Sequence, residues 1–195
     1  MVDLGLQAQA ERYFGFLVER GFICTESTPY RVRFESPEVF VELVFDGNRS
    51  YELGLLVGQL SSERSGVPPF SIGEILRLRH APEAEQYSLV QVTSEEALAT
   101  FVEELSLMLQ TYAFDFIAGR SDSFAELGRE REREVRVYAL ERDLRLARAD
   151  AEEAWRAKDY PGVVRALSAR RGTLTRSEIR RLQFAEDRLR QERPN

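Results

Sequence analysis

The chain has 195 residues, of which 43% are hydrophobic and 31% charged, and its formal net charge at pH 7 is -6. These totals exclude a disordered chain, because they supply enough apolar side chains for the core of one domain, or of one domain with a helical appendage. The single cysteine excludes an internal disulfide, and the first residues lack the basic flank and apolar run of a signal peptide. We therefore expect a cytoplasmic protein.

The first predicted elements are a helix and a strand meander. Helical spacing over residues 3–20 predicts an amphipathic helix that stops at Gly21. Its inward side chains are Leu6, Tyr13, Phe14 and Leu17. Period-two alternation then predicts half-buried antiparallel strands, with a turn at 46–49. The strand segments are 30–35, 39–45 and 51–57, with a weaker one at 22–26.

Three features follow the meander. Gly54 and Gly58 share one face of the last strand, which predicts the close approach of a helix, or a bulge. Ser71 and Glu74 have capping-box spacing and predict a short helix that ends near His80. Residues 83–92 remain open between two interpretations. Tyr87, Leu89 and Gln91 could alternate as an edge strand, or the segment could be a packed loop.

The longest apolar helical pattern runs from Thr93 to Arg120. Thr93 and Glu96 have capping-box spacing, and Gly119 is suited to a left-handed cap at the other end. Apolar residues cover the last turns nearly all round, which predicts cover on more than one side. Charged residues interrupt the apolar run, so a membrane span is not expected. Asp115 lies among apolar neighbours and is expected to pair with Arg120 or with an Arg of the sheet.

After Gly119 the sequence predicts only helices. A short helical turn over 121–127 precedes a charged helical connector at 128–136, and a near-heptad pattern follows. Its seam residues are Val137, Leu140, Leu144, Ala147, Ala151, Ala154 and Lys158. A second helix begins at Asp159 and Pro161, and a third at the capping box of Thr175 and Glu178. Trp155 is expected to fill the space between the tail helix and its neighbour.

We therefore predict an α+β fold: a small antiparallel sheet of three to four strands covered by helices, followed by a helical hairpin or three-helix tail. The predicted domains are residues 1–120 and 121–195. The first carries 18 acids and 9 bases, net -9, and the second 15 acids and 18 bases, net +3, which together give the total of -6. The acidic front argues against nucleic-acid binding by that domain and suits a basic protein partner.

The chain offers little catalytic chemistry. His80 is the one histidine and is expected at the surface, and Cys24 is expected to be a buried, inert thiol. No spacing typical of zinc or nucleotide binding occurs, so no catalytic, metal or cofactor residue is assigned. We assign instead an interaction surface to six charged residues. They are Glu42, Asp46, Glu52, Arg129, Arg131 and Arg133.

Two parts of the chain resemble known groups of proteins. The stretch AEEAWRAKDYPGVVRALSARRG resembles half of a tetratricopeptide repeat, although it lacks the usual Gly and a second copy. The segments YFGFLVERGF (13–22), VELVFDGNRSYELGL (41–55) and FSIGEILRL (70–78) resemble small bacterial α+β proteins that look like the immunity partners of toxins. This resemblance implies a non-catalytic protein that neutralises another protein.

Three functional hypotheses follow. The first is a non-enzymatic cytoplasmic protein that binds another protein, as an immunity-like partner does. The second is a structural or oligomerising module in which tail helices pair between chains, giving a homo-oligomer. The third is a small-ligand binder or enzyme that uses carboxylates and arginines of the sheet, for which Glu42, Asp46 and Glu52 would have to converge. On a half-exposed antiparallel face, we expect these three carboxylates to be solvated instead. No membrane partner is expected.

Overall fold

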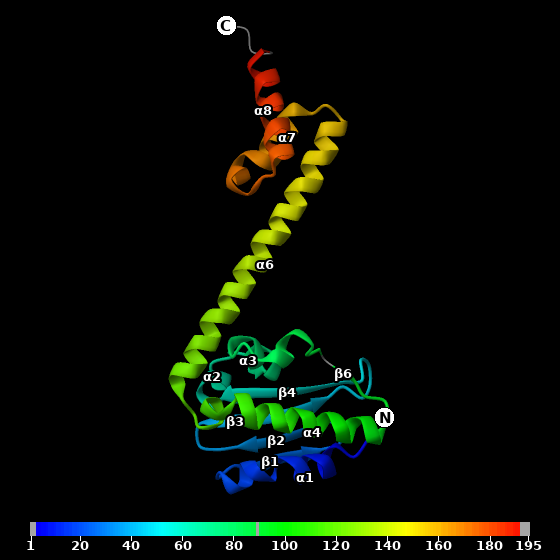
Figure 1. Ribbon diagram of the computed structural model, residues 1–195, viewed down its shortest axis with the longest axis vertical. Coiled ribbons are helices and arrows are strands. Elements are labelled where there is room, and N and C mark those ends of the chain that lie inside the picture. Colours follow the sequence, from blue (N-terminus) through cyan, green and yellow to red (C-terminus); the bar gives the residue numbers. More distant parts are fainter. Residues whose placement is uncertain (1–2, 89, 192–195) are drawn as a thin grey trace. The chain divides into compact units, whose positions relative to one another are not determined.

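The alternating segments of the first half form an antiparallel sheet, and helices pack against it (Figure 1). The computed structural model describes residues 3–88 and 90–191. It confirms the predicted α+β class with a helical C-terminal part. The chain divides between Arg131 and Glu132 into two compact units, each described by itself below. In the described ranges, no helix combines the length and apolar character needed to cross a bilayer.

The described residues form a sheet of six strands, more than the three or four predicted. Its bounds are β1 Ile23–Thr28, β2 Arg31–Glu35, β3 Val39–Phe45, β4 Glu52–Gln59, β5 Phe70–Ser71 and β6 Val90–Gln91. Strands β1 to β5 pair in sequence order, and β6 pairs with β4 beside Glu52. The two additional strands have two residues each, too few for an alternating pattern to show in the sequence.

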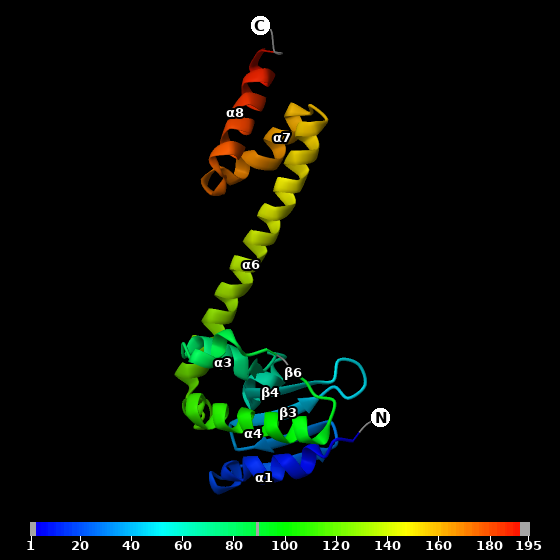
Figure 2. The same ribbon diagram turned by 45° about the vertical axis from the view of Figure 1, so that its right-hand side comes forward.

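The helices of the first unit cover the sheet. They are α1 Leu6–Glu19, α2 Leu60–Arg64, α3 Ile72–Leu78, η1 Pro82–Glu85, α4 Glu95–Tyr112 and α5 Phe114–Ile117, with the beginning of α6. Helices α1 and α4 lie side by side (Figures 1 and 2), where the Ser106 hydroxyl donates to the Tyr13 carbonyl at 2.7 Å. Tyr13, expected to face inward, is half-buried at this contact.

The segment 93–120 is two helices rather than one. Helix α4 is capped by Ser94, whose side chain accepts from the Ala97 amide, so the predicted capping box at Thr93 is wrong. The helix ends at Tyr112, because Ala113 leaves helical geometry (φ -110°, ψ 17°). The break turns the fully buried Phe116 into the core, where its ring meets Phe124 edge-on.

Gly119, Ser71 and Gly58 have definite local roles. Gly119 has the predicted left-handed backbone, with φ +76°. The predicted capping box at the start of α3 is confirmed, since Ser71 and Glu74 bond each other's backbone amides. Gly58 allows a close approach, but of an aromatic ring and not of a helix. A Cβ at this position would lie 2.5 Å from Cζ of Phe40.

Residues 83–92 contain both predicted kinds of structure. The segment begins with the η1 turn and ends with the short strand β6. Tyr87 is half-buried, and its ring packs closely against Gly73 of α3. Leu89, predicted as an alternating strand residue, lies outside the described residues. The expected packed loop therefore carries a two-residue edge strand at its end.

Helix α6 runs without a break over Ser121–Arg156, so the predicted turn, connector and tail helix are one element. Phe124 and Leu127 in its first turns belong to the core of the first unit. The structure therefore divides the chain within α6, where the sequence places a boundary at residue 120. The second unit contains the rest of α6 with α7 Tyr160–Leu167, η2 Ser168–Thr173 and α8 Arg176–Gln191.

The three helices of the second unit enclose a small core. It is built from Ala151, Val163, Leu167, Leu182 and Ala185. The predicted N-cap at Asp159 and the capping box of Thr175 and Glu178 are both present. Trp155 meets Tyr160 and Phe184 edge-on, as its predicted role requires.

The predicted seam of α6 is buried only in part. Ala147 and Ala151 are buried, whereas Val137 and Leu140 are 48% and 70% exposed. Lys158 lies beyond the end of the helix with φ +56°, so it is not a seam residue. The periodic pattern thus predicted the helix correctly, but only some of the seam residues pack against other helices of the second unit.

Candidate functional site

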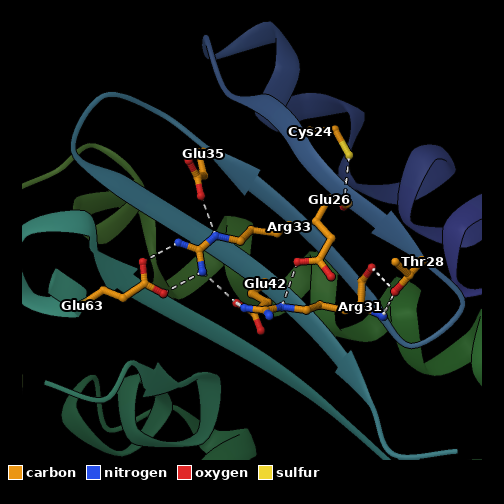
Figure 3. Close-up of polar contacts among 8 residues, drawn as sticks. All are labelled: Cys24, Glu26, Thr28, Arg31, Arg33, Glu35, Glu42 and Glu63. Carbon is orange, nitrogen blue, oxygen red and sulfur yellow. Dashed lines mark hydrogen bonds and ion pairs between the residues drawn. The ribbon is translucent and has the colours of Figure 1, made fainter. Parts of the chain in front are cut away.

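The predicted interaction residue Glu42 is buried, and it lies in an ion-pair network that joins β2, β3 and α2 (Figure 3). Its carboxylate accepts from Arg31 at 2.8 Å and from Arg33 at 3.2 Å. Arg33 also donates to Glu35 at 2.7 Å and makes two bonds to Glu63 of α2, at 2.8 and 2.7 Å. The expectation that Glu42 is solvated is therefore wrong, because α2 and the arginines cover this end of the sheet face.

Arg33 is the centre of this network. It is 7% exposed, and its guanidinium lies 3.9 Å from the centroid of the Phe40 ring. The hydrogen bonds that Arg33 donates to Glu63 and Glu35 outweigh the effect of burial and raise the pKa of Arg33. The hydrogen bond from Arg33 lowers the pKa of Glu63. Arg33 and Glu42 are buried and hydrogen-bonded to each other, so these two residues form a structural support and are not available to a ligand.

The other two predicted carboxylates do not join Glu42. Asp46 turns into the β3–β4 loop, where it accepts from the backbone amides of Asn48 and Arg49. Glu52 is half-buried at the start of β4, opposite Gln91 of β6. Because Glu42 faces Leu56 further along β4, the pairing separates Glu42 from Asp46 and Glu52, whose backbones bond each other at 2.9 Å. The convergence required by the enzyme hypothesis is absent at these residues.

The predicted arginines have different environments. Arg131 donates to Glu74 at 2.6 Å and to the carbonyl of Pro69 at 2.7 Å, and it lies over the Phe70 ring. It therefore fastens the beginning of α6 to the first unit. Arg129 is exposed on the same helix, and Arg133 is exposed in the second unit.

The structure also tests the predicted environments of three further residues. Asp115 is only half-buried and pairs with Arg120 as expected, at 3.7 Å, and with Arg79 of α3 at 2.9 Å. Cys24 is exposed on the edge strand β1, so the expected buried thiol is wrong. His80 is exposed at the end of α3, as expected. Within the described ranges, no group of three or more His, Cys, Asp or Glu side chains could hold a metal ion.

A groove lies between α4 and the segment that precedes it. Its volume is about 450 Å³, and a neighbouring hollow of about 390 Å³ shares Val90, Phe101 and Glu104 with it. We call the two together the α4 groove. Its apolar lining consists of Tyr87, Val90, Phe101, Leu107, Met108 and Tyr112. Its acidic lining consists of Glu83, Glu96 and Glu104.

The α4 groove combines exposed apolar surface with negative charge. Leu107 is 58% exposed and Val90 is 36% exposed. Residues 81–114 contain six carboxylates, namely Glu83, Glu85, Glu95, Glu96, Glu103 and Glu104, and no Lys, Arg or His. The wall is fixed where the Tyr112 hydroxyl donates to Glu83 at 2.7 Å. Burial raises the pKa of Tyr87 to about 12, so this phenol is neutral at physiological pH.

The groove was not predicted from the sequence, because acidic and basic residues were counted over each whole domain. The long run without a basic residue was a readable signal, and so were the apolar positions Leu107 and Met108 beside Glu103 and Glu104 on the predicted helix. The second wall could not be foreseen, because it depends on how residues 83–88 and Val90 pack beside α4.

No protein-family model matches the chain, and neither a curated protein nor a solved structure matches it.

Proposed function

We propose that this protein binds another protein through the α4 groove and performs no catalysis itself. The partner contributes a basic amphipathic segment, whose apolar side chains enter the groove while its Lys or Arg side chains meet the surrounding glutamates. The observation that carries the proposal is the coincidence of exposed Leu107 and Val90 with a 34-residue segment, 81–114, that has carboxylates and no basic side chain.

Physical arguments favour this occupant. An apolar hollow with a charged rim is a common form of protein-binding surface, because the apolar centre supplies affinity and the rim supplies selectivity. An acidic rim repels acidic partners and accelerates the approach of basic ones. The groove is lined by a helix and a short strand of the folded unit, so little ordering is required on this side of the interface.

We further propose that binding neutralises the partner, as an immunity-like protein neutralises a toxin in the cytoplasm. The support is the resemblance of the segments 13–22, 41–55 and 70–78 to such proteins, together with the acidic charge of the unit that contains them. A protein of this kind acts by occupying a surface of its partner, so it needs no catalytic group of its own.

Affinity capture from the native host with three baits tests the proposal. The baits are the unmodified chain, a groove variant with Leu107→Asp and Glu104→Arg, and a matched variant with Ile23→Asp on β1. Ile23 is 71% exposed, and β1 is the strand edge opposite β4 and β6. We expect one basic protein with the first and third baits, weakened at high salt, and its loss with the groove variant. Equal capture by all three baits would contradict the proposal.

A further inference from the structure

The middle of α6 carries large apolar side chains that lie open to solvent in the second unit. Those more than half exposed are Val135, Tyr138, Leu140 and Leu146, and Val137 is 48% exposed. A solvated helix without a partner is normally polar all round. Exposed apolar side chains of this kind are typical of a helix face that a partner covers. The described residues of the second unit do not supply that partner.

One stripe of these residues continues a packed seam. Val137, Leu140 and Leu144 follow heptad spacing into Ala147 and Ala151. From Ala147 onward the stripe is buried, and Ala151 belongs to the core formed with α7 and α8. Before Ala147, Leu144 is half-buried, whereas Val137 and Leu140 are 48% and 70% exposed and have no cover among the described residues of the second unit. The chain's own helices thus occupy one end of the seam and leave the other end free.

We propose that α6 of a second copy covers this free end, in a short parallel pairing over residues 136–144 with both helices in register. Val137, Leu140 and Leu144 then face their own counterparts across a two-fold axis. The helices diverge at Ala147, since α7 and α8 occupy the seam from that point. This site lies in the second unit and is independent of the α4 groove.

Charge complementarity selects the second copy and the parallel direction. Arg136 precedes Val137, and Glu141 follows Leu140, so these residues flank the seam as g and e positions. In a parallel pair in register, the g residue of one helix lies beside the e residue of the next heptad in the other. Arg136 of each copy therefore meets Glu141 of the other, and the contact forms twice.

The antiparallel alternative is disfavoured by the same charges. It brings e positions together, so Glu141 would face Glu134 or Glu141 of the second copy, which is repulsive. Arg136 is available for the parallel contact, because its pair with Glu132 is 3.6 Å long and both side chains are about 70% exposed. Among residues 3–88 and 90–191, none makes an ion pair with Glu141.

Sedimentation of the full chain at several concentrations tests the pairing. We expect a monomer–dimer equilibrium that Leu140→Asp weakens by at least about tenfold in dissociation constant. The matched control is Val135→Asp, because Val135 is also exposed but lies on the opposite side of the helix. A monomer at every concentration, or equal weakening by both variants, would overturn the proposal.

Cysteine cross-linking and charge reversal test the register. The chain has one cysteine, so Cys24→Ser gives a background free of thiols. In that background, Val137→Cys should form an intermolecular disulfide and Val135→Cys should not, because residue 137 faces its own counterpart and residue 135 does not. Glu141→Arg should weaken the dimer, and adding Arg136→Glu should restore it. A dimer with no cross-link at 137, or with no restoration, would refute the parallel register.

Discussion

Replacing Arg33 by methionine tests how much the ion pairs of Arg33 contribute to the stability of the first unit. Arg33 is 7% exposed and donates to Glu35, Glu42 and Glu63. Methionine retains much of the apolar stem but removes every donor. Glu42, which is 6% exposed, would keep only the bond from Arg31 at 2.8 Å. The variant therefore removes one of the two arginines that neutralise the buried Glu42 carboxylate.

The magnitude follows from the burial of each partner. Removing one member of a fully buried ion pair costs roughly 3–5 kcal/mol. Here Glu42 keeps Arg31, and the side chain of Glu63 is 42% exposed and contributes little. We therefore expect the first unit to lose about 2–3 kcal/mol of unfolding free energy. The double variant Arg33→Met with Glu42→Leu should recover most of the loss, because no uncompensated charge remains.

The assay must separate the two units. Hydrogen exchange of peptides from β2 and β3 reports the first unit, and urea unfolding followed by circular dichroism gives the free energy. Trp155 is the single tryptophan and belongs to the second unit, so its fluorescence transition should not move. A loss below about 1 kcal/mol, or a double variant no more stable than the single one, would refute the reasoning.

Three other predictions concern the first unit. Arg131→Ala should destabilise the first unit by about 2 kcal/mol, because the Glu74 carboxylate loses two charged hydrogen bonds. In the same urea titration, Arg129→Ala should be near neutral, because Arg129 is exposed. Gly58→Ala should lower the unfolding free energy by roughly 1–3 kcal/mol, because the added Cβ would lie 2.5 Å from the Phe40 ring. Gly15→Ala should raise it by about 0.5–1 kcal/mol, because Gly15 lies inside α1 and an added Cβ would meet no atom within 4 Å. For Glu74, burial alone would raise the pKa, but bonds from Arg131 and the Ser71 amide hold it below the ordinary 4.5. Its contribution is therefore complete above about pH 5 and is lost as pH falls through the lowered folded pKa, and pH-dependent unfolding of Arg131→Ala should show a shallower acid loss.

Local sequence signals accounted for much of the fold. The capping boxes at Ser71 and Thr175 are recognisable because each depends on two residues three positions apart. The strands β2, β3 and β4 were predictable for the same reason, since alternation is a local property. The division of 93–120 into α4 and α5 was not predictable, because Ala113 is compatible with a helix and only the core requires the turn.

The candidate site was harder to predict than the fold. Glu42 and Arg33 alternate with apolar residues in the pattern of a solvated face, and only the docking of Glu63 from α2 shows that they are buried. The pattern gives the face of a strand but not what covers that face. The α4 groove depends on the packing of residues 83–88 and Val90 beside α4, which is a tertiary contact. Its charge, in contrast, was already present in the sequence.

Photo-cross-linking in the native host tests the central claim most directly. A benzophenone amino acid at position 107 lies in the α4 groove, and the same group at position 23 lies on the opposite strand edge. We predict that position 107 cross-links one partner through a Lys- or Arg-rich amphipathic segment, identified by mass spectrometry, and that position 23 does not. No adduct at 107 above that at 23, or adducts only to acidic segments, would contradict binding through this groove.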